Sequence, residues 1–271
     1  MLAVHLAHGK VEVRRQPVPR VPEGFARIRL LAAGICSTDL ELQRGYYGFA
    51  GTPGHEFVGE VVEVNGSMGE KTQWTSQRVA GEINLACGDC DWCARGLGRH
   101  CPTRTVLGII KHPGAFREFL TLPIRNLHRV PSSISTEDAV FIEPVGAACE
   151  ILDQVKIPKS ERVAVLGDGK LGLLIAQVLQ AHGAQVHLMG RHRDKMRLVE
   201  FAGVTSEVVK KKMPTSAYQY VVDSTGSSEG LSTAIAMCQP RGTVIMKSTV
   251  HGLVSINTAV PIVNEITMVG S

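Results

Sequence analysis

The hydrophobic positions divide the chain into a first half that favours strands and a second half in which strands and helices alternate. In the first half, partly alternating or β-branched segments predict strands at residues 26–32, 57–64, 78–83 and 116–122. The turn pair Asn65-Gly66 ends one of them, and glycines and prolines punctuate the rest. Short strands separated in this way predict a compact, barrel-like β domain.

The second half begins with helical segments and then repeats a strand–helix unit. Ser135 starts a predicted helix, and residues 143–155 form another that ends before Pro158. Strands are predicted at residues 162–166, 185–189, 220–223, 242–246 and 266–269, and helices at residues 170–182, 193–201 and 228–238. Strands separated by helices require right-handed crossovers, so the predicted fold class here is α/β with a parallel, doubly wound sheet.

The length of 271 residues corresponds to about two domains. The change of pattern places the boundary between residues 140 and 158. We therefore predict one domain of residues 1–143 and a second of residues 144–271.

A glycine-rich loop follows the first strand of the predicted parallel sheet. Residues 167–172 read Gly-Asp-Gly-Lys-Leu-Gly, and a helix follows directly. In a dinucleotide site such glycines allow a tight turn, the approach of the backbone to a pyrophosphate and close packing of helix on strand. The helix N-terminus adds unpaired N–H groups. The predicted site comprises Gly167, Gly169, Lys170, Leu171 and Gly172; the alternative is a glycine-rich turn in another kind of α/β sheet.

The end of the next strand bears on the choice of dinucleotide. NAD sites place an acid there, about 20 residues beyond the loop, to bind the ribose hydroxyls. This chain has Gly190 at that place, followed by Arg191 and Arg193. Because a small residue leaves room and guanidinium groups pair well with a 2′-phosphate, we expect NADP to be favoured over NAD. Alternatively, both arginines belong to a solvated helix start.

Cysteines are concentrated in one segment. Of the seven in the chain, Cys87, Cys90, Cys93 and Cys101 provide four thiolates at short spacing, which is typical of a closed tetrahedral zinc shell. Such a shell leaves no position for a substrate, so we expect a structural zinc. An iron–sulfur cluster is the alternative.

Three other segments carry candidate metal ligands, although each alone has an ordinary structural explanation. Cys36 suits a small core position, His55 a hydrogen-bonded loop, and Glu143 the first turn of a helix. Their joint occurrence in one chain asks for a common explanation.

Together these motifs resemble the zinc-dependent medium-chain dehydrogenases of the alcohol dehydrogenase superfamily, most closely the polyol, threonine and glucose dehydrogenase branch. The resemblance covers the whole chain. It rests on Gly34-Ile35-Cys36-Ser37-Thr38-Asp39, Gly54-His55-Glu56, the four-cysteine segment, Glu143-Pro144 and the glycine loop, all in the family's order. It implies a GroES-like β-barrel catalytic domain followed by a Rossmann nucleotide-binding domain, with two zinc ions per chain.

The resemblance also implies roles for single residues. A catalytic zinc is expected on Cys36 and His55, with Glu56 or Glu143 as the third protein ligand. Zinc lowers the pKa of a substrate hydroxyl, Thr38 is expected to take its proton, and a hydride passes to the nicotinamide. We thus expect an oxidoreductase that acts on a polyol, sugar or secondary alcohol with NADP or NAD.

Asp39 is expected to orient the imidazole of His55. Cys149 and Asp168 receive no metal or catalytic role. Members of the family continue well beyond the last strand of the nucleotide domain, whereas this sequence stops at Ser271. If the protein ends there, we expect weak or no activity.

Composition and charge limit the partners. A net charge of +4 is too small an excess to indicate nucleic-acid binding. The sequence has no apolar run near the length of about 20 residues that spans a bilayer, and its first ten residues do not read as a signal peptide. We expect a cytoplasmic homodimer or homotetramer with a small-molecule alcohol or carbonyl substrate and no nucleic-acid or membrane partner.

Two other classes of function compete with the enzyme. A non-catalytic NADP-binding sensor would keep the glycine loop but has no need of Cys36, His55 and Glu143 together. A zinc-ribbon nucleic-acid binder would need basic and aromatic residues clustered around its cysteines, where this sequence has few.

Overall fold

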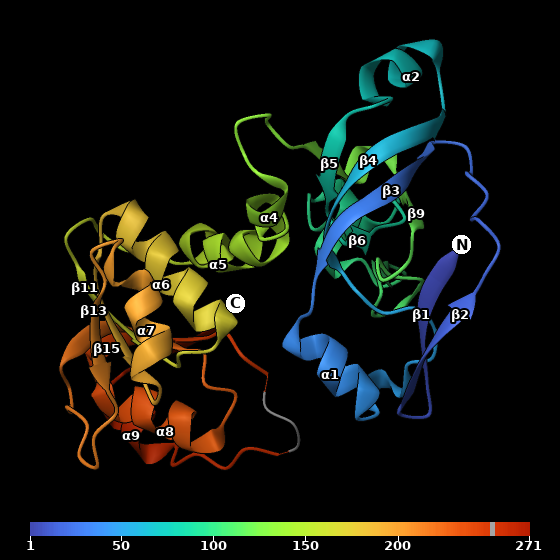
Figure 1. Cartoon of the computed structure of the whole chain (residues 1–271). Helices are drawn as coiled ribbons and strands as arrows, with labels where there is room; N and C mark the ends of the chain where they lie inside the picture. Colours follow the sequence, from blue (N-terminus) through green and yellow to red (C-terminus); the bar gives the residue numbers. More distant parts are fainter. Residues whose placement is uncertain (250–252) are drawn as a thin grey trace. The chain divides into compact units, whose positions relative to one another are not determined.

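The computed structural model describes residues 1–249 and 253–271. It divides into two compact units, Met1–Glu143 and Pro144–Ser271 (Figure 1). Each unit has its own hydrophobic core, so each is described by itself.

The first unit is built on a five-stranded antiparallel sheet with the strand order β10-β5-β4-β3-β9. Its strands are β3 (Phe25–Gly34), β4 (Glu56–Asn65), β5 (Arg78–Gly81), β9 (Phe119–Pro123) and β10 (Leu127–Arg129). The long strands β3 and β4 pair from Phe25 opposite Asn65 to Gly34 opposite Glu56. Alternate residues of β3, such as Ala26 and Ile28, are fully buried in the core, as expected for a sheet with one covered face.

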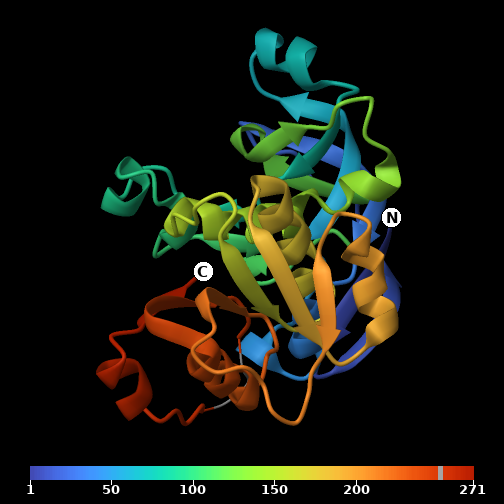
Figure 2. The same cartoon turned by 90° about the vertical axis from the view of Figure 1, so that its left-hand side faces the viewer.

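Shorter elements complete the first unit. The remaining strands are β1 (Leu2–Ala7), β2 (Lys10–Arg15), β6 (Asn84–Leu85), β7 (Thr105–Leu107) and β8 (Lys111–His112). Its helices are α1 (Ser37–Gln43), α2 (Met68–Trp74), α3 (Asp91–Ala94) and α4 (Thr136–Ala139), with 3-10 turns η1 (Tyr46–Gly48), η2 (Gly98–His100) and η3 (Ile124–Asn126). In Figures 1 and 2, α2 lies at the far end of β4. A capping box, in which Ser67 and Glu70 each accept the other's backbone N–H, starts that helix.

The second unit is a six-stranded parallel sheet covered by helices on both faces. Its strand order is β13-β12-β11-β14-β15-β16. The strands are β11 (Arg162–Leu166), β12 (Gln185–Gly190), β13 (Thr205–Val208), β14 (Tyr218–Asp223), β15 (Cys238–Met246) and β16 (Thr267–Gly270). The helices are α5 (Ile142–Gln154), whose first two residues belong to the first unit, α6 (Lys170–His182), α7 (Arg193–Glu200), α8 (Ser228–Met237) and α9 (Ala259–Val263). This order is that of a Rossmann sheet, which starts in its centre and winds outward in both directions.

The two faces of the parallel sheet have separate cores. Val163 and Val165 of β11 pack with helices α5, α6 and α7, whereas the alternate residues Ala164 and Leu166 pack with α8. Because both faces are buried, residues Val163 to Leu166 of the strand form an uninterrupted apolar run without polar alternation.

Sequence patterns located the elements of the second unit more closely than those of the first. The predicted strand 162–166 and helix 170–182 have the bounds of β11 and α6. The hairpin of β1 and β2 was missed, since every residue of β2 is exposed and its sequence is largely charged. The short helices α1 and α2 and the strand β13 were also missed. Within the described residues, no helix has the length and apolarity required to cross a membrane.

Core packing in the second unit predicts a specific loss of stability. Leu188 in β12 is fully buried, so Leu188→Ala should lower the free energy of unfolding by about 2–5 kcal/mol through lost burial and a residual cavity. The control Leu198→Ala on α7, where the side chain is 64% exposed, should cost less than about 0.5 kcal/mol.

Urea titration followed by far-UV circular dichroism measures both variants. Both tryptophans, Trp74 and Trp92, lie in the first unit, so tryptophan fluorescence gives a second, separate readout. An unchanged circular dichroism transition in Leu188→Ala would contradict the described packing.

Candidate functional site

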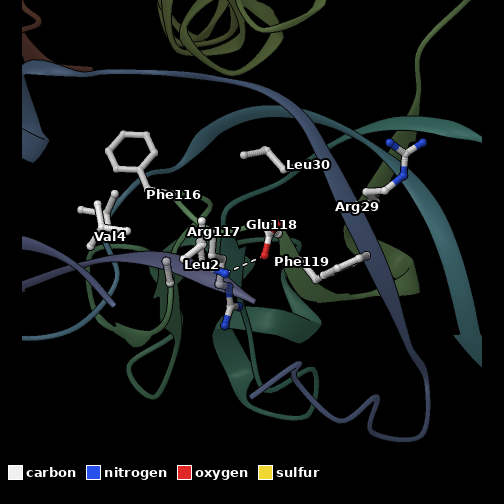
Figure 3. A pocket seen from close by; sticks show the side chains of 10 residues that line it. Leu2, Val4, Arg29, Leu30, Phe116, Arg117, Glu118 and Phe119 are labelled. Atoms are coloured by element: carbon white, nitrogen blue, oxygen red, sulfur yellow. Dashed lines mark hydrogen bonds between the residues drawn. The ribbon is translucent and has the colours of Figure 1, made fainter. Parts of the chain in front are cut away.

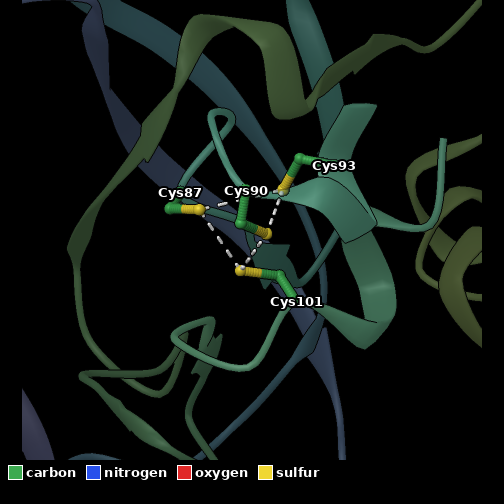
Figure 4. Close-up of side chains that lie close together, drawn as sticks. All are labelled: Cys87, Cys90, Cys93 and Cys101. Carbon is green, nitrogen blue, oxygen red and sulfur yellow. Dashed lines mark hydrogen bonds between the residues drawn. The ribbon is translucent and has the colours of Figure 1, made fainter. Parts of the chain in front are cut away.

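The four-cysteine segment of the first unit forms a compact group of sulfurs (Figure 4). Neighbouring Sγ atoms are 3.5 Å apart for Cys90–Cys93 and Cys87–Cys101, 3.8 Å for Cys90–Cys101 and 3.9 Å for Cys87–Cys93. A tetrahedral shell with zinc–sulfur bonds of about 2.3 Å has sulfur–sulfur edges of about 3.8 Å. The arrangement therefore fits one zinc ion with no position left open.

Local backbone features bring these thiols together. Gly88 and Gly96 have positive φ angles of 93° and 75°, which allow the chain to turn sharply on either side of α3. The backbone N–H of Gly88 donates to the Sγ of Cys93 at 3.4 Å. A backbone hydrogen bond from Cys87 and the hydroxyl of Thr103 lower the pKa of the Cys101 thiol to about 6, which favours the thiolate that a metal requires.

A second group of donors lies where β3 ends and β4 begins. Ligand atoms of Cys36, His55 and Glu56 all lie within 4.8 Å of one another. The paired residues Gly34 and Glu56 explain part of this geometry, because a Cβ at Gly34 would stand 2.3 Å from Glu56 Oε2. Glycine at 34 is therefore what lets the Glu56 carboxylate fold across the neighbouring strand.

Asp39 connects the two segments that carry these donors. Its Oδ2 accepts the backbone N–H of Cys36 at 2.8 Å, and its Oδ1 accepts that of Gly54 at 3.1 Å. The same Oδ1 lies 3.6 Å from His55 Nδ1. Asp39 is only 7% exposed, so this carboxylate is an internal brace of the group. The structure thus brings Asp39 next to His55, as the family resemblance implied.

The pKa values of His55 and Glu143, two buried groups at this site, are both shifted upward. Burial opposes protonation of His55, but hydrogen bonding with Asp39 and Cys36 and the charges of Asp39 and Glu143 raise its pKa to about 10. Burial raises the pKa of Glu143 to about 7, with contributions from Glu56. A cation among the carboxylates would replace the proton on His55 and stabilise the charged acids.

The same group passes a test of fit for zinc. The donors offered are one thiol, one imidazole and one carboxylate, all ordinary zinc ligands, and their ligand atoms lie within 4.8 Å of one another. Three protein ligands leave a fourth position open, as in catalytic zinc sites. Glu143 does not belong to the close group of three, but its charge reaches both His55 and Glu56.

Thr38 lies beside this group on the first turn of α1. Its Oγ1 is 3.6 Å from the Sγ of Cys36. The hydroxyl therefore stands next to a ligand atom, which is where a group that moves a substrate proton must be.

The first unit also contains a cavity of about 450 Å³ along β1, β3 and β9 (Figure 3). Its wall is mainly apolar, including Leu2, Leu30, Phe116 and Phe119. Glu118 in this wall accepts the backbone N–H of Leu2 at 2.6 Å. None of the candidate metal ligands lines this cavity, so it is separate from the donor group.

The glycine loop of the second unit has the geometry that its sequence predicted. Gly167 has a φ of 110°, and a Cβ there would stand 2.7 Å from the carbonyl oxygen of Ser224. Gly169 is the N-cap of α6, and a Cβ at Gly172 would stand 2.1 Å from the carbonyl oxygen of Gly167. Lys170 and Leu171 form the first turn of α6, whose N-terminal N–H groups suit a pyrophosphate.

The end of β12 differs from the expected picture. Gly190 leaves room there, but the side chain of Asp168 fills it: a Cβ at Gly190 would stand 2.4 Å from Asp168 Cβ. Arg193 is engaged by Glu200 at 2.9 Å and by Ser206.

Asp168 is thus a candidate binding residue that sequence reasoning passed over. Its Oδ2 accepts the backbone N–H of His192 and lies 3.0 Å from His192 Nδ1. Burial by itself would raise the pKa of Asp168, but the hydrogen bonds and charge of His192 lower it, so the group remains a carboxylate at neutral pH. The available signal was an acid inside the glycine loop combined with a glycine at the end of the next strand.

Two donor groups that could hold metal ions in a β unit, together with a glycine loop in a Rossmann unit, are typical of metal-dependent and dinucleotide-dependent oxidoreductases. Family models agree: residues 22–132 match the alcohol dehydrogenase GroES-like domain, and residues 171–271 match the zinc-binding dehydrogenase domain. The chain belongs to the zinc-binding alcohol dehydrogenase family.

Individual relatives point to the same branch. The chain is 29% identical over 250 residues to a sorbitol dehydrogenase of Halalkalibacterium halodurans, covering 86% of this chain and 72% of the relative. It is 30% identical over 250 residues to an L-threonine 3-dehydrogenase of Chelativorans sp., covering 86% and 71%. A zinc-binding dehydrogenase of Sinorhizobium meliloti, solved with NADP bound, superposes with a TM-score of 0.90 at 27% identity, covering 100% of this chain and 83% of that one.

These comparisons confirm the predicted family, its polyol and threonine dehydrogenase branch, and the pairing of a GroES-like domain with a Rossmann domain. They also confirm the predicted class of activity, a zinc-dependent alcohol or polyol oxidoreductase, and its cofactors, zinc with NADP or NAD.

The two donor groups predict separable zinc contents. The wild-type protein should hold two zinc ions per chain by elemental analysis. Cys93→Ser should lose the ion of the four-sulfur group, and His55→Ala the ion of the Cys36 group, because each removes one ligand from a small set. Each variant should therefore retain one ion.

Cys149→Ser is the matched control, since Cys149 is exposed and belongs to neither donor group. It should keep both ions. Loss of both ions from His55→Ala alone would show that the two groups do not bind independently, contrary to the geometry.

Proposed function

We propose that this protein is an NAD(P)-dependent dehydrogenase that interconverts a polyol, sugar or secondary alcohol with its carbonyl product. The observation that carries the proposal is the three-donor group of Cys36, His55 and Glu56, which leaves a metal position open to a substrate oxygen. A sensor that only binds the dinucleotide has no use for such a group.

In this proposal Cys36, His55 and Glu56 hold the catalytic zinc. Glu143 is an alternative carboxylate ligand for the same ion, and its charge interacts with those of His55 and Glu56. Bound zinc supplies a Lewis acid that lowers the pKa of the substrate hydroxyl, and the bound nicotinamide supplies the hydride acceptor. Cys87, Cys90, Cys93 and Cys101 hold the second, structural zinc.

The chain's own residues handle orientation and the proton. Asp39 fixes the imidazole of His55 through their 3.6 Å contact. Thr38, beside Cys36, accepts the substrate hydroxyl proton during oxidation and returns it during reduction. The 3.6 Å contact between the Cys36 thiol and the Thr38 hydroxyl supports a hydroxyl that faces the donor group.

The second unit binds the coenzyme. Gly167, Gly169 and Gly172, with the first turn of α6, form the pyrophosphate cradle. Arg191 is exposed and provides a cation for the 2′-phosphate of NADP, whereas Arg193 is already paired with Glu200.

The substrate class and assembly follow the relatives. A small alcohol or carbonyl compound agrees with the names of the sorbitol and threonine dehydrogenases. We propose a cytoplasmic homodimer or homotetramer with no nucleic-acid or membrane partner. The strand β16 supports assembly, because it is the last strand of the parallel sheet among the described residues and an edge strand can pair with a second copy.

Turnover tests the proposed function directly. Zinc-loaded protein is mixed with NADPH or NADH and a panel of ketoses, aldehydes and simple ketones, and the loss of absorbance at the nicotinamide band is followed. Turnover of at least one carbonyl supports the enzyme. Coenzyme binding without turnover across the panel would favour the sensor.

The role of Thr38 gives a sharper prediction. Thr38→Val removes the hydroxyl at nearly constant volume and should lower kcat by about 10²–10⁴-fold, as expected when a proton-transfer group is lost. Thr38→Ser keeps a hydroxyl and should retain most activity. Both variants should still contain two zinc ions, and an undiminished kcat in Thr38→Val would exclude Thr38 from proton transfer.

A further inference from the structure

The carboxylate at the end of β12 comes from the glycine loop and not from β12 itself. Asp168 follows Gly167 directly, and its residue exposure is only 7%. Its side chain lies over Gly190, the last residue of β12. An acid is therefore present at the strand end where NAD sites carry one, although it arrives from another part of the chain.

Asp168 and any side chain at position 190 compete for one volume. A Cβ built on Gly190 would stand 2.4 Å from Asp168 Cβ, 2.6 Å from its Cγ and 2.7 Å from its Oδ2. These distances are shorter than real carbon contacts, so an acid at 190 requires Asp168 to leave. Compared with an NAD site that has its acid at the strand end, this chain has the acid in the glycine loop and a glycine at the strand end, so the carboxylate occupies the same space.

His192 fixes the direction of this carboxylate. Its backbone N–H donates to Asp168 Oδ2, and its Nδ1 lies 3.0 Å from the same atom. Both contacts engage Oδ2, and Oδ1 takes part in neither. The imidazole is about half exposed, with 53% of its side-chain surface accessible, whereas the Asp168 side chain is 10% exposed.

We propose that Asp168 supplies the carboxylate that binds the adenosine ribose hydroxyls, and that its negative charge opposes the 2′-phosphate of NADP. The inference rests on the proposed function only in that the second unit binds a dinucleotide. Gly190 and Arg191 favour NADP, and Asp168 limits that preference. The ratio of the two affinities is therefore set by a residue of the glycine loop.

A competing role for Asp168 predicts the opposite change in NADPH affinity when its charge is removed. If the carboxylate only orients His192 so that its imidazole binds the 2′-phosphate, then losing the charge of Asp168 weakens NADPH. If Asp168 itself binds the ribose, losing the charge weakens NADH and strengthens NADPH. Equilibrium binding distinguishes the two roles without any catalysis.

The experiment measures dissociation constants of NADH and NADPH by nicotinamide fluorescence, with the full, zinc-loaded chain. Asp168→Asn is nearly isosteric and can still accept the N–H of His192. We expect NADH to weaken about tenfold, as for a lost hydrogen bond to a charged group, and NADPH to bind more tightly. Asp194→Asn removes an equal charge from the start of α7, where the side chain is 97% exposed, and should change neither constant.

The exchange of positions provides the second variant. Asp168→Gly together with Gly190→Asp returns the carboxylate to the strand end, so the double variant should bind NADH within about threefold of the wild type, a difference below 1 kcal/mol. Gly190→Asp alone should bind NADH poorly, because two side chains then share one volume. On the wild-type protein, 5′-AMP should compete with NADH, and removal of the charge in Asp168→Asn should improve competition by 2′,5′-ADP.

The outcomes separate the two proposals. Binding of both coenzymes with an unchanged ratio in Asp168→Asn, or a loss of NADPH affinity, overturns the role of Asp168 and leaves the dehydrogenase intact. Failure of the wild type to bind either coenzyme overturns both.

Discussion

Much of the first unit's chemistry depends on the carboxylate of Asp39, which is buried and shared among three groups. It accepts hydrogen bonds from the backbone N–H groups of Cys36 and Gly54, and it lies 3.6 Å from the imidazole of His55. These contacts join the turn after β3 to the start of β4, so a thiol and an imidazole from separate segments are held at one place. Buried carboxylates are costly unless their oxygens are hydrogen-bonded, and Asp39 meets that condition with the same contacts that assemble the donors.

Charge is the second constraint on this group. The charges of Asp39 and Glu143 act on the buried imidazole of His55, and the charge of Glu56 acts on Glu143. Burial raises the pKa of Glu143, and hydrogen bonding and the neighbouring acids raise the pKa of His55. The two donor groups differ in how they would coordinate a metal ion. Four sulfurs would enclose the ion in the four-cysteine group, whereas Cys36, His55 and Glu56 would provide three donors and leave one position open.

Local patterns were sufficient wherever a residue's role is set by its own strand or helix. The bounds of β11 and α6 followed from an apolar run and a glycine loop. The spacing of the four cysteines was sufficient to predict that their thiols lie close together. The hairpin of β1 and β2 carried no such signal, because its outer strand is exposed and charged. The choice between Glu56 and Glu143 as a close donor also required the structure, since it depends on Gly34 leaving space on the neighbouring strand.

The meeting of Asp168 with Gly190 lay outside the reach of linear patterns. It follows from the parallel register of β11 and β12, in which Leu166 stands beside Met189. Residues just past these two positions emerge at the same edge of the sheet, so the loop and the strand end can exchange side chains. The sequence of β12 alone shows a glycine at position 190 where NAD sites have an acid. The space beside that glycine nevertheless contains a carboxylate, which comes from Asp168. Coenzyme classes within such a family are therefore better sorted by which atoms occupy that shared volume than by the residue found at one aligned column.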